Sequence, residues 1–241
     1  MEEQFTTITF FRFNGFKNRF FAFSQMGMPF HPEKIDGLIF SKKVGTGAGY
    51  GFSAVPNFGV YGWMNVWESK SHFEKFKEQN SDWQNWLSKS SESWTTYLKP
   101  IKVHGSWSNH QPFRIEDPLP EGEWVAAITR ATIKWKNLLQ FWWLVPEISR
   151  KMQAMAKDLF SIGFGEVPFR ELATFSIWAE VDYLEHFAYQ SPEHKKAIQL
   201  TRKYDWFSEE LFARFIVVGV EGNWDGFDDL LQMKKKYGSV L

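Results

Sequence analysis

The chain carries the same series of residues twice, and this internal repeat constrains the fold more than any other feature. Ser91-Glu92 followed by Trp107 recurs as Ser208-Glu209 followed by Trp224, at a constant separation of 117 residues (224 − 107). Upstream, Trp67 corresponds to Trp178 at a separation of 111 residues (178 − 67), and Lys17-Asn18 to Lys136-Asn137 at 119 (136 − 17). Matches in the same order indicate a duplicated unit. We expect a first module over residues 1–110 and a second over 123–241, joined by the proline-containing linker 111–122.

Each copy has the periodicity of a strand, helix, strand, strand, helix and strand in that order. The first copy predicts strands at Phe5 to Phe13, Leu38 to Val44, Val60 to Trp67 and Thr95 to His104, with helices from Gly15 to Met28 and, with a break, from Ser69 to Ser91. The second predicts strands at Trp124 to Thr132, Leu159 to Ile162, Leu172 to Ala179 and Leu211 to Val220, with helices from Lys134 to Lys157 and Asp182 to Lys203.

A βαββαβ unit is the ferredoxin-like module, an antiparallel sheet with helices on one face and an apolar second face that needs cover. Two such sheets can cover each other. The fold class predicted is therefore α+β, with tandem ferredoxin-like modules forming a pseudo-dimeric α+β barrel. The pocket is expected either between a sheet and its helices or between the two sheets.

The charge balance argues against a nucleic-acid partner, because 28 Lys and Arg are matched by 28 Asp and Glu. Met1-Glu2-Glu3 is unlike a signal peptide, and no apolar run approaches the roughly 20 residues of a spanning helix. We expect a cytoplasmic protein. The run Lys234, Lys235, Lys236 leaves open a transient membrane-surface contact at the inner membrane face, and the sequence also leaves open a homo-oligomer.

Cysteine is absent, whereas aromatic residues make up 19% of the chain. The absence of Cys excludes disulfides, iron-sulfur clusters and thiolate-ligated haem, so any metal must be held by His, Tyr, Met or carboxylates. The aromatic content, spread over 25 Phe, 13 Trp and 7 Tyr, favours a wide apolar pocket.

The segment from Val44 to Phe52 contains four glycines, and it has two competing interpretations. Its spacing fits neither of the glycine-rich phosphate-binding motifs, so a nucleotide site is not expected. The functional interpretation is a substrate loop, carried by Gly45, Gly47, Gly49 and Phe52, that closes over a ligand. The alternative is an ordinary long turn.

Among the six histidines, His194 is the preferred metal ligand. Ser191 and Pro192 are typical of a helix start, and Ala197, Ile198 and Thr201 share a helical face with His194 while lysines occupy the other side. An inward His with small neighbours leaves room for a flat group, although a hydrogen-bonded core histidine is the alternative. His186 is expected to be exposed, and His72 is ambiguous. His31-Pro-Glu33 has the spacing of a non-haem iron site but lacks a second His.

Two arginines lie among apolar residues of predicted strands, Arg130 and Arg214. A buried guanidinium needs an anionic partner. That partner is either a nearby carboxylate, such as Glu180 or Glu209, or a cofactor propionate or bound oxygen species in an active site.

Six segments spread over nearly the whole chain carry a resemblance to a known family. They are Gly45 to Asn57, Trp94 to Leu98, Ile128 to Thr132, Ile162 to Pro168, Thr174 to Trp178 and His194 to Phe215. In this order they resemble the spheroidene monooxygenases, the carotenoid 2-ketolases that oxidise acyclic carotenoids.

The resemblance implies a haem-dependent monooxygenase that uses haem b, O2, an unidentified electron donor and a long apolar substrate. From its position on the predicted helix and its place in a matching segment, we expect His194 to be the axial ligand, with Phe175, Trp178 and Ile198 around the cofactor and Arg130 and Arg214 in catalytic roles. A haem-dependent dehydratase or peroxidase-like enzyme for a smaller substrate, and a non-enzymatic binder of haem or an apolar ligand, are the alternatives because one fold hosts several chemistries.

Overall fold

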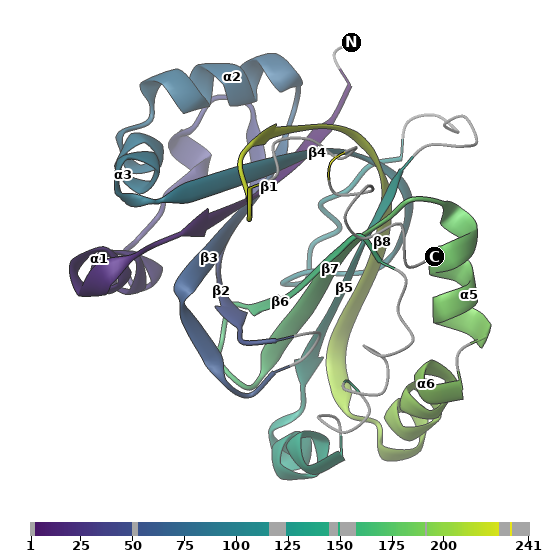
Figure 1. Ribbon diagram of the computed structural model, residues 1–241. Coiled ribbons are helices and arrows are strands. Elements are labelled where there is room, and N and C mark those ends of the chain that lie inside the picture. Colours follow the sequence, from purple (N-terminus) through teal and green to yellow (C-terminus); the bar gives the residue numbers. More distant parts are fainter. Residues whose placement is uncertain are drawn as a thin grey trace.

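The computed structural model describes residues 3–49, 53–115, 124–144, 158–190 and 192–226, together with residues 149 and 232. Within these ranges the chain forms two halves of equal topology (Figure 1). Four predicted features lie wholly or partly outside the described residues: most of the linker, Phe52 of the substrate loop, residues 145–148 and 150–157 of the helix predicted from Lys134 to Lys157, and the run Lys234, Lys235, Lys236.

In the described residues the first half contains four strands, three α-helices and a short 3-10 helix (Pro32–Lys34). The strands are β1 (Phe5–Arg12), β2 (Leu38–Gly47), β3 (Pro56–Trp67) and β4 (Glu92–Gly105), and the helices are α1 (Gly15–Met26), α2 (Lys70–Gln79) and α3 (Ser81–Lys89). The predicted break between the last two helices lies at Asn80, whose side chain accepts a hydrogen bond from the Trp83 backbone N–H at 2.9 Å. This is an N-cap, so it ends one helix and starts the next.

The second half repeats the order. Its strands are β5 (Val125–Ile133), β6 (Phe160–Gly165), β7 (Glu171–Trp178) and β8 (Phe207–Gly222). A short 3-10 helix (Trp135–Asn137) continues into helical residues 138–144, and α5 (Val181–Gln190) and α6 (Pro192–Tyr204) precede β8. Pro192 stands at the first position of α6, where its missing N–H costs no hydrogen bond.

The eight strands close into one antiparallel barrel in the order β1-β3-β2-β6-β7-β5-β8-β4. Each half contributes a ferredoxin-like sheet, β2-β3-β1-β4 or β6-β7-β5-β8. The sheets join where β2 pairs with β6 through Gly45 and Gly165, and along the long β4–β8 ladder. The predicted α+β barrel of two ferredoxin-like modules is confirmed.

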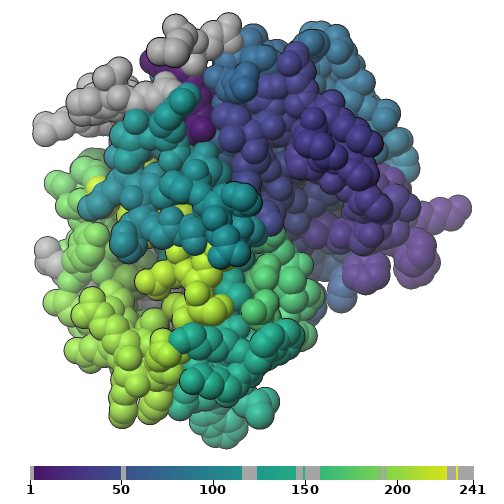
Figure 2. Space-filling view, turned by 180° about the vertical axis from the view of Figure 1, so that it is seen from behind, coloured from purple at the N-terminus to yellow at the C-terminus, as the bar shows by residue number. Residues whose placement is uncertain are grey.

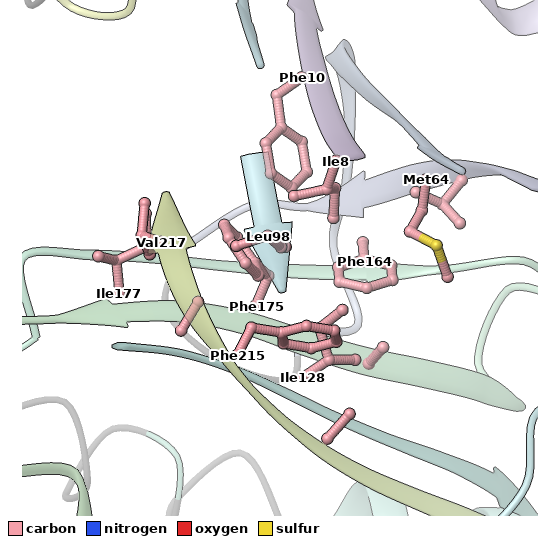
Figure 3. Close-up of a cluster of buried hydrophobic side chains, with 14 of the residues drawn as sticks. Ile8, Phe10, Met64, Leu98, Ile128, Phe164, Phe175, Ile177, Phe215 and Val217 are labelled. Atoms are coloured by element: carbon pink, nitrogen blue, oxygen red, sulfur yellow. The ribbon is translucent and has the colours of Figure 1, made fainter. Parts of the chain in front are cut away.

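The barrel interior is a filled hydrocarbon core rather than a channel. Ile8, Phe10 and Met64 of the first half meet Ile128, Phe164 and Phe175 of the second (Figure 3). The ring centroids of Phe10 and Phe175 are 6.0 Å apart. Because alternate residues of each strand point to opposite sides, the remaining residues form the outer faces on which the helices lie.

Gly45 and Gly47 belong to β2 rather than to a loop, which corrects the predicted strand end at Val44. The pairing continues because Gly45 lies opposite both Tyr61 and Gly165, and Thr46 Oγ1 donates a hydrogen bond to the Val60 carbonyl at 2.8 Å. Gly49 follows the strand at φ +96°, a conformation that glycine adopts without strain.

One end of the barrel is closed by an ion network around Arg130, whose side chain is 3% exposed. Its guanidinium pairs with Glu209 and lies 3.5 Å from Glu171 and 3.6 Å from Glu166. Burial raises the pKa of Glu209, but hydrogen bonds from the Asn109 N–H and the Ser106 hydroxyl, together with Arg130, bring it below its usual value. The carboxylate is therefore charged in the folded protein, as its buried cation requires.

Arg130→Met is expected to destabilise the fold by roughly 3–5 kcal/mol at neutral pH, because three carboxylates lose their shared cation. Glu209 has a lowered pKa in the folded state, so the stability it contributes is present above the unfolded pKa and is lost as the pH falls through the folded pKa. The difference between wild type and variant should therefore shrink in acid. Urea unfolding between neutral and acidic pH measures it.

Arg170→Met is the control, because Arg170 is 25% exposed and its guanidinium lies 3.3 Å from Glu171 alone among the described carboxylates. A change within about 1 kcal/mol is expected there. Equal losses in the two variants would contradict the network as described.

Within the described ranges, no helix combines the length and apolar character needed to cross a bilayer.

Candidate functional site

Helix α5 positions two side chains of the second half through residues one turn apart. Nδ1 of His194 lies 2.5 Å from the Ala188 carbonyl oxygen, and Nη1 of Arg214 lies 2.9 Å from Glu185 Oε1. Residues three apart on a helix lie on the same face. A backbone carbonyl of α5 therefore holds His194, which belongs to α6, and the Glu185 carboxylate of α5 holds Arg214, which belongs to β8.

The hydrogen bond to Ala188 determines which tautomer His194 adopts. A carbonyl oxygen only accepts, so Nδ1 carries the proton and Nε2 is the ring nitrogen with a lone pair. Burial lowers the pKa of His194, which outweighs the opposing effect of the hydrogen bond to Ala188. A neutral imidazole whose Nδ1–H is fixed by a carbonyl is the form in which histidine binds metals.

Arg214 is buried, and only part of its guanidinium is neutralised. Its side chain is 7% exposed and Nη1 contacts Glu185, but Nε and Nη2 have no hydrogen-bond partner in the part of the chain that the structure describes. Unpartnered donors on a buried cation are costly. This arrangement suits an additional anionic or carbonyl group beside β8.

Part of the outer face of the second sheet, between the clusters around Leu172 and Trp178, carries small residues. They are Ala127, Thr129 and Ala131 of β5, Thr174 and Ser176 of β7, and Ser161 and Gly163 of β6, which alternate with core residues such as Ile128 and Phe175. Thr129 is exposed although it lies in the middle of a central strand. The helices of this half that the structure describes therefore leave Thr129 exposed.

The first half has large side chains at the corresponding positions. Trp67 pairs with Phe5 and its repeat equivalent Trp178 pairs with Val125, which aligns the two registers. By this alignment Trp63 corresponds to Thr174, opposite Thr9 and Thr129 respectively. Thr9 is 1% exposed, whereas Thr129 is exposed. The position that holds an indole in the first half holds a small side chain in the second.

The helices of the first half also bury larger side chains against their sheet than α6 does in the second half. Phe73 and Phe76 of α2 and Trp83 and Trp86 of α3 are buried against the first sheet. On α6 the face that contains His194, Ala197, Ile198 and Thr201 is only half-buried. A flat apolar group could therefore be accommodated between α6 and the second sheet.

Aromatic rings link His194 to that sheet. The Phe187 ring lies 5.7 Å from the His194 ring and 5.2 Å from the Trp178 ring, centroid to centroid. Trp178 is buried on the outer face of β7, with its indole N–H bonded to Ser176 Oγ at 2.9 Å. Ile198 is one helical turn beyond His194 on α6. The structure thus brings His194, Trp178, Ile198 and Arg214 to the same side of the second sheet.

Other sequence-predicted residues lie elsewhere. Phe175 and Arg130 point into the barrel, on the opposite side of the second sheet from Trp178. Gly47 and Gly49 line a cavity of about 680 Å³ at the end of the barrel away from Arg130. Arg12 and Trp224 also line this cavity, with the guanidinium carbon 4.5 Å from the ring centroid.

The remaining histidines do not form a metal site. His186, His104 and His110 are exposed, and His31 is bonded at 3.0 Å to Glu33, which is also exposed. His72 Nδ1 is hydrogen-bonded to Ser69 Oγ at 2.8 Å, near the start of α2. Across the described residues, no group of three or more His, Asp or Glu side chains is arranged to hold a metal ion.

The small-residue face and the end cavity were not predicted from the sequence. Comparison of the two repeat copies would have signalled the small-residue face, since Trp63 corresponds to Thr174 at the separation of 111 residues (174 − 63) set by Trp67 and Trp178. No local signal marks the cavity, because its lining comes from β1, α1, β2, β3 and β6 together with residues beyond β8.

Comparison with known structures supports the fold. Two aldoxime dehydratase crystal structures, one with bound butyraldoxime, superpose with TM-scores of 0.52 and 0.55 over 89% of this chain and 81% and 79% of theirs. Their sequence identities are only 9% and 8%, so the likeness concerns the fold alone.

Sequence relatives are more informative, although no protein-family profile matches the chain. Spheroidene monooxygenase of Rhodobacter capsulatus is 35% identical over 93% of this chain and 94% of its own length. The proteins of the same name from Cereibacter sphaeroides and Rubrivivax gelatinosus are 36% and 31% identical, over 93% and 79% of this chain and 70% and 73% of their own. This chain belongs to the spheroidene monooxygenase family.

Proposed function

We propose that this monooxygenase is haem-dependent and oxidises a long apolar, carotenoid-like substrate with O2. The observation that carries the proposal is the identity to three proteins that are all named spheroidene monooxygenase. The name gives the reaction class and a polyene as the substrate class. The asymmetry between the two sheets supports the cofactor.

The residues on the outer side of the second sheet fit a haem. His194 offers a neutral, oriented imidazole, the small residues of β5 and β7 leave a flat uncovered area, and Trp178 and Ile198 supply apolar contact. Arg214 offers buried donors suited to a propionate. Because the chain lacks Cys, a histidine is the natural axial ligand.

When bound, haem b would supply the iron at which O2 is activated. The protein would supply the ligand to the iron, orient the cofactor and keep water away from it. His194 is held by Ala188, so its ring cannot rotate away, and the cation of Arg214 is kept in place by Glu185. The surrounding apolar rings would exclude water from the reacting centre.

A spectrum and an isotope experiment test the proposal together. The full chain, purified after expression with a haem supply, should show a Soret band. With spheroidene, ¹⁸O2 and a supplied two-electron donor, one ¹⁸O atom should enter the product while the second leaves as water with two protons. A haem-free protein that still oxygenates spheroidene would overturn the cofactor, and a haem protein that incorporates no ¹⁸O would overturn the reaction.

A further inference from the structure

Helix α1 exposes a line of aromatic side chains to solvent. Phe16, Phe20 and Phe23 are 83%, 61% and 55% exposed, while Ala22 on the other face is buried. The Phe16 and Phe20 rings stack at 6.1 Å, and Phe23 contacts Phe58, itself 54% exposed, at 5.9 Å. Spacings of four and three residues place the three on one face of the helix. We call Phe16, Phe20, Phe23 and Phe58 the first stripe.

The second half repeats this feature. Trp135, Leu139 and Trp143 are 70%, 90% and 86% exposed, and we call them the second stripe. Since Lys17-Asn18 corresponds to Lys136-Asn137, Phe16 corresponds to Trp135 and Phe20 to Leu139. Large apolar side chains exposed in contiguous rows are uncommon on monomeric proteins and mark an interaction surface.

The two stripes lie on either side of the seam between β2 and β6. In Figure 1, α1 and the teal helix that contains residues 138–144 flank that seam. From behind, purple α1 lies at the right edge of the molecule and the teal segment at its bottom (Figure 2). One extended surface could therefore contact both stripes.

The charged residues near the two stripes indicate which kind of partner surface they would contact. Residues 15–26 contain Lys17 and Arg19, residues 134–144 contain Lys134 and Lys136, and neither segment contains Asp or Glu. Lys17 and Arg19 form no ion pair with any residue that the structure describes, and Lys134 pairs with Asp205. Aromatic residues on one side of a helix, with cations and no acidic residue in the same segment, are typical of helices that lie in a membrane interface.

We propose that the two stripes dock the protein onto an anionic lipid bilayer surface. Trp and Phe partition into the interfacial region, and the lysines and arginine attract acidic headgroups. A second copy of this chain fits less well, because its equal numbers of acidic and basic residues offer no field to complement the cations. The inference stands on the surface alone and does not depend on the proposed function.

Docking would bring the end cavity to the lipid. Arg19 of α1 lines that cavity, as do Asn57 and Gly59, which flank Phe58 of the first stripe. An apolar molecule dissolved in the bilayer would then reach the cavity rim without crossing water.

The test is flotation of the full chain with vesicles of phosphatidylcholine alone and of phosphatidylcholine with phosphatidylglycerol. Wild type should float with the anionic vesicles and bind neutral ones more weakly. Phe16→Glu/Phe20→Glu and Trp135→Glu/Leu139→Glu should each lower the partition coefficient at least tenfold, roughly the effect of losing one buried large side chain. These residues are exposed, so the melting temperature should be preserved.

Ile115→Glu is the matched control, because Ile115 is 48% exposed outside both stripes. It should bind anionic vesicles as wild type does. Wild type that stays unbound, or stripe variants that bind as tightly as wild type, would overturn the proposal. So would a wild-type dimer in sedimentation velocity that the stripe variants convert to monomer without any vesicle binding by wild type. Oxygenation of detergent-dispersed substrate reports separately on the proposed function.

Discussion

His194→Ala is expected to abolish stable haem binding while leaving the barrel folded. The variant removes an imidazole that is fixed by the Ala188 carbonyl on the side of the second sheet with small residues. Loss of an axial ligand should exceed the roughly 10- to 100-fold loss of affinity seen when a supporting residue of a metal site is removed. The Soret absorbance per chain after gel filtration measures this, and oxygenation of spheroidene should fall with it.

The fold should tolerate the change, because His194 is near the start of α6 and only half-buried. A loss of about 1 kcal/mol in unfolding free energy is expected. His186→Ala is the control, since His186 is exposed on the neighbouring helix. A Soret band of normal height and position in His194→Ala would refute the assignment and direct attention to His72.

Thr174→Trp should have an effect of similar size for the opposite reason. It places on the second sheet the indole that Trp63 provides at the equivalent position of the first. Trp63 packs against Phe76, Trp83 and Trp86 and helps to fill its side of the barrel. An indole at position 174 would occupy the uncovered area opposite Thr129, so haem content and activity are each expected to drop by about 100-fold or more.

The stability of this variant separates a blocked site from a damaged fold. Because Thr129 is exposed, the added ring should meet open space, and the melting temperature should stay unchanged or rise as apolar area is buried. Thr174→Val keeps the volume of the side chain and should retain haem. Full haem content in Thr174→Trp would show that the cofactor lies elsewhere, and a collapse of the melting temperature would show that the area is already filled.

Sequence periodicity predicted the elements well and their ends less well. The repeat gave two copies of a βαββαβ unit, and the strand order confirms both. The strand ends moved where pairing with another strand extended them. β2 continues through Gly47 because β3 and β6 lie alongside it, and β8 extends to Gly222 because that end of it pairs with Trp94 of β4. Such pairing involves residues far apart in the chain, so no local pattern reports it.

The candidate site was predicted unevenly. Helical phase placed His194 on the half-buried face of α6, since a single helix determines that property. Phe175 and Arg130 were expected beside the same site, yet they point into the barrel, on the side of the second sheet away from Trp178. A strand buried on both faces has apolar residues at successive positions, so its sequence does not say which face is which.

The sequence by itself determined the duplicated module, the barrel class and the family, because these depend on residue order and on periodicities of two and 3.6 that a linear chain displays. Only the tertiary structure showed that the outer faces of the two sheets are filled by side chains of different size. Trp63 and Thr174 are each unremarkable in their own strands, and their contrast appears only when the registers of two sheets are compared. The partners of Arg130 and Arg214, the exposure of both aromatic stripes and the end cavity likewise arise from segments brought together in space. Packing between distant segments determines which residue of an apolar strand lies beside unfilled space, and a ligand can bind only in such space.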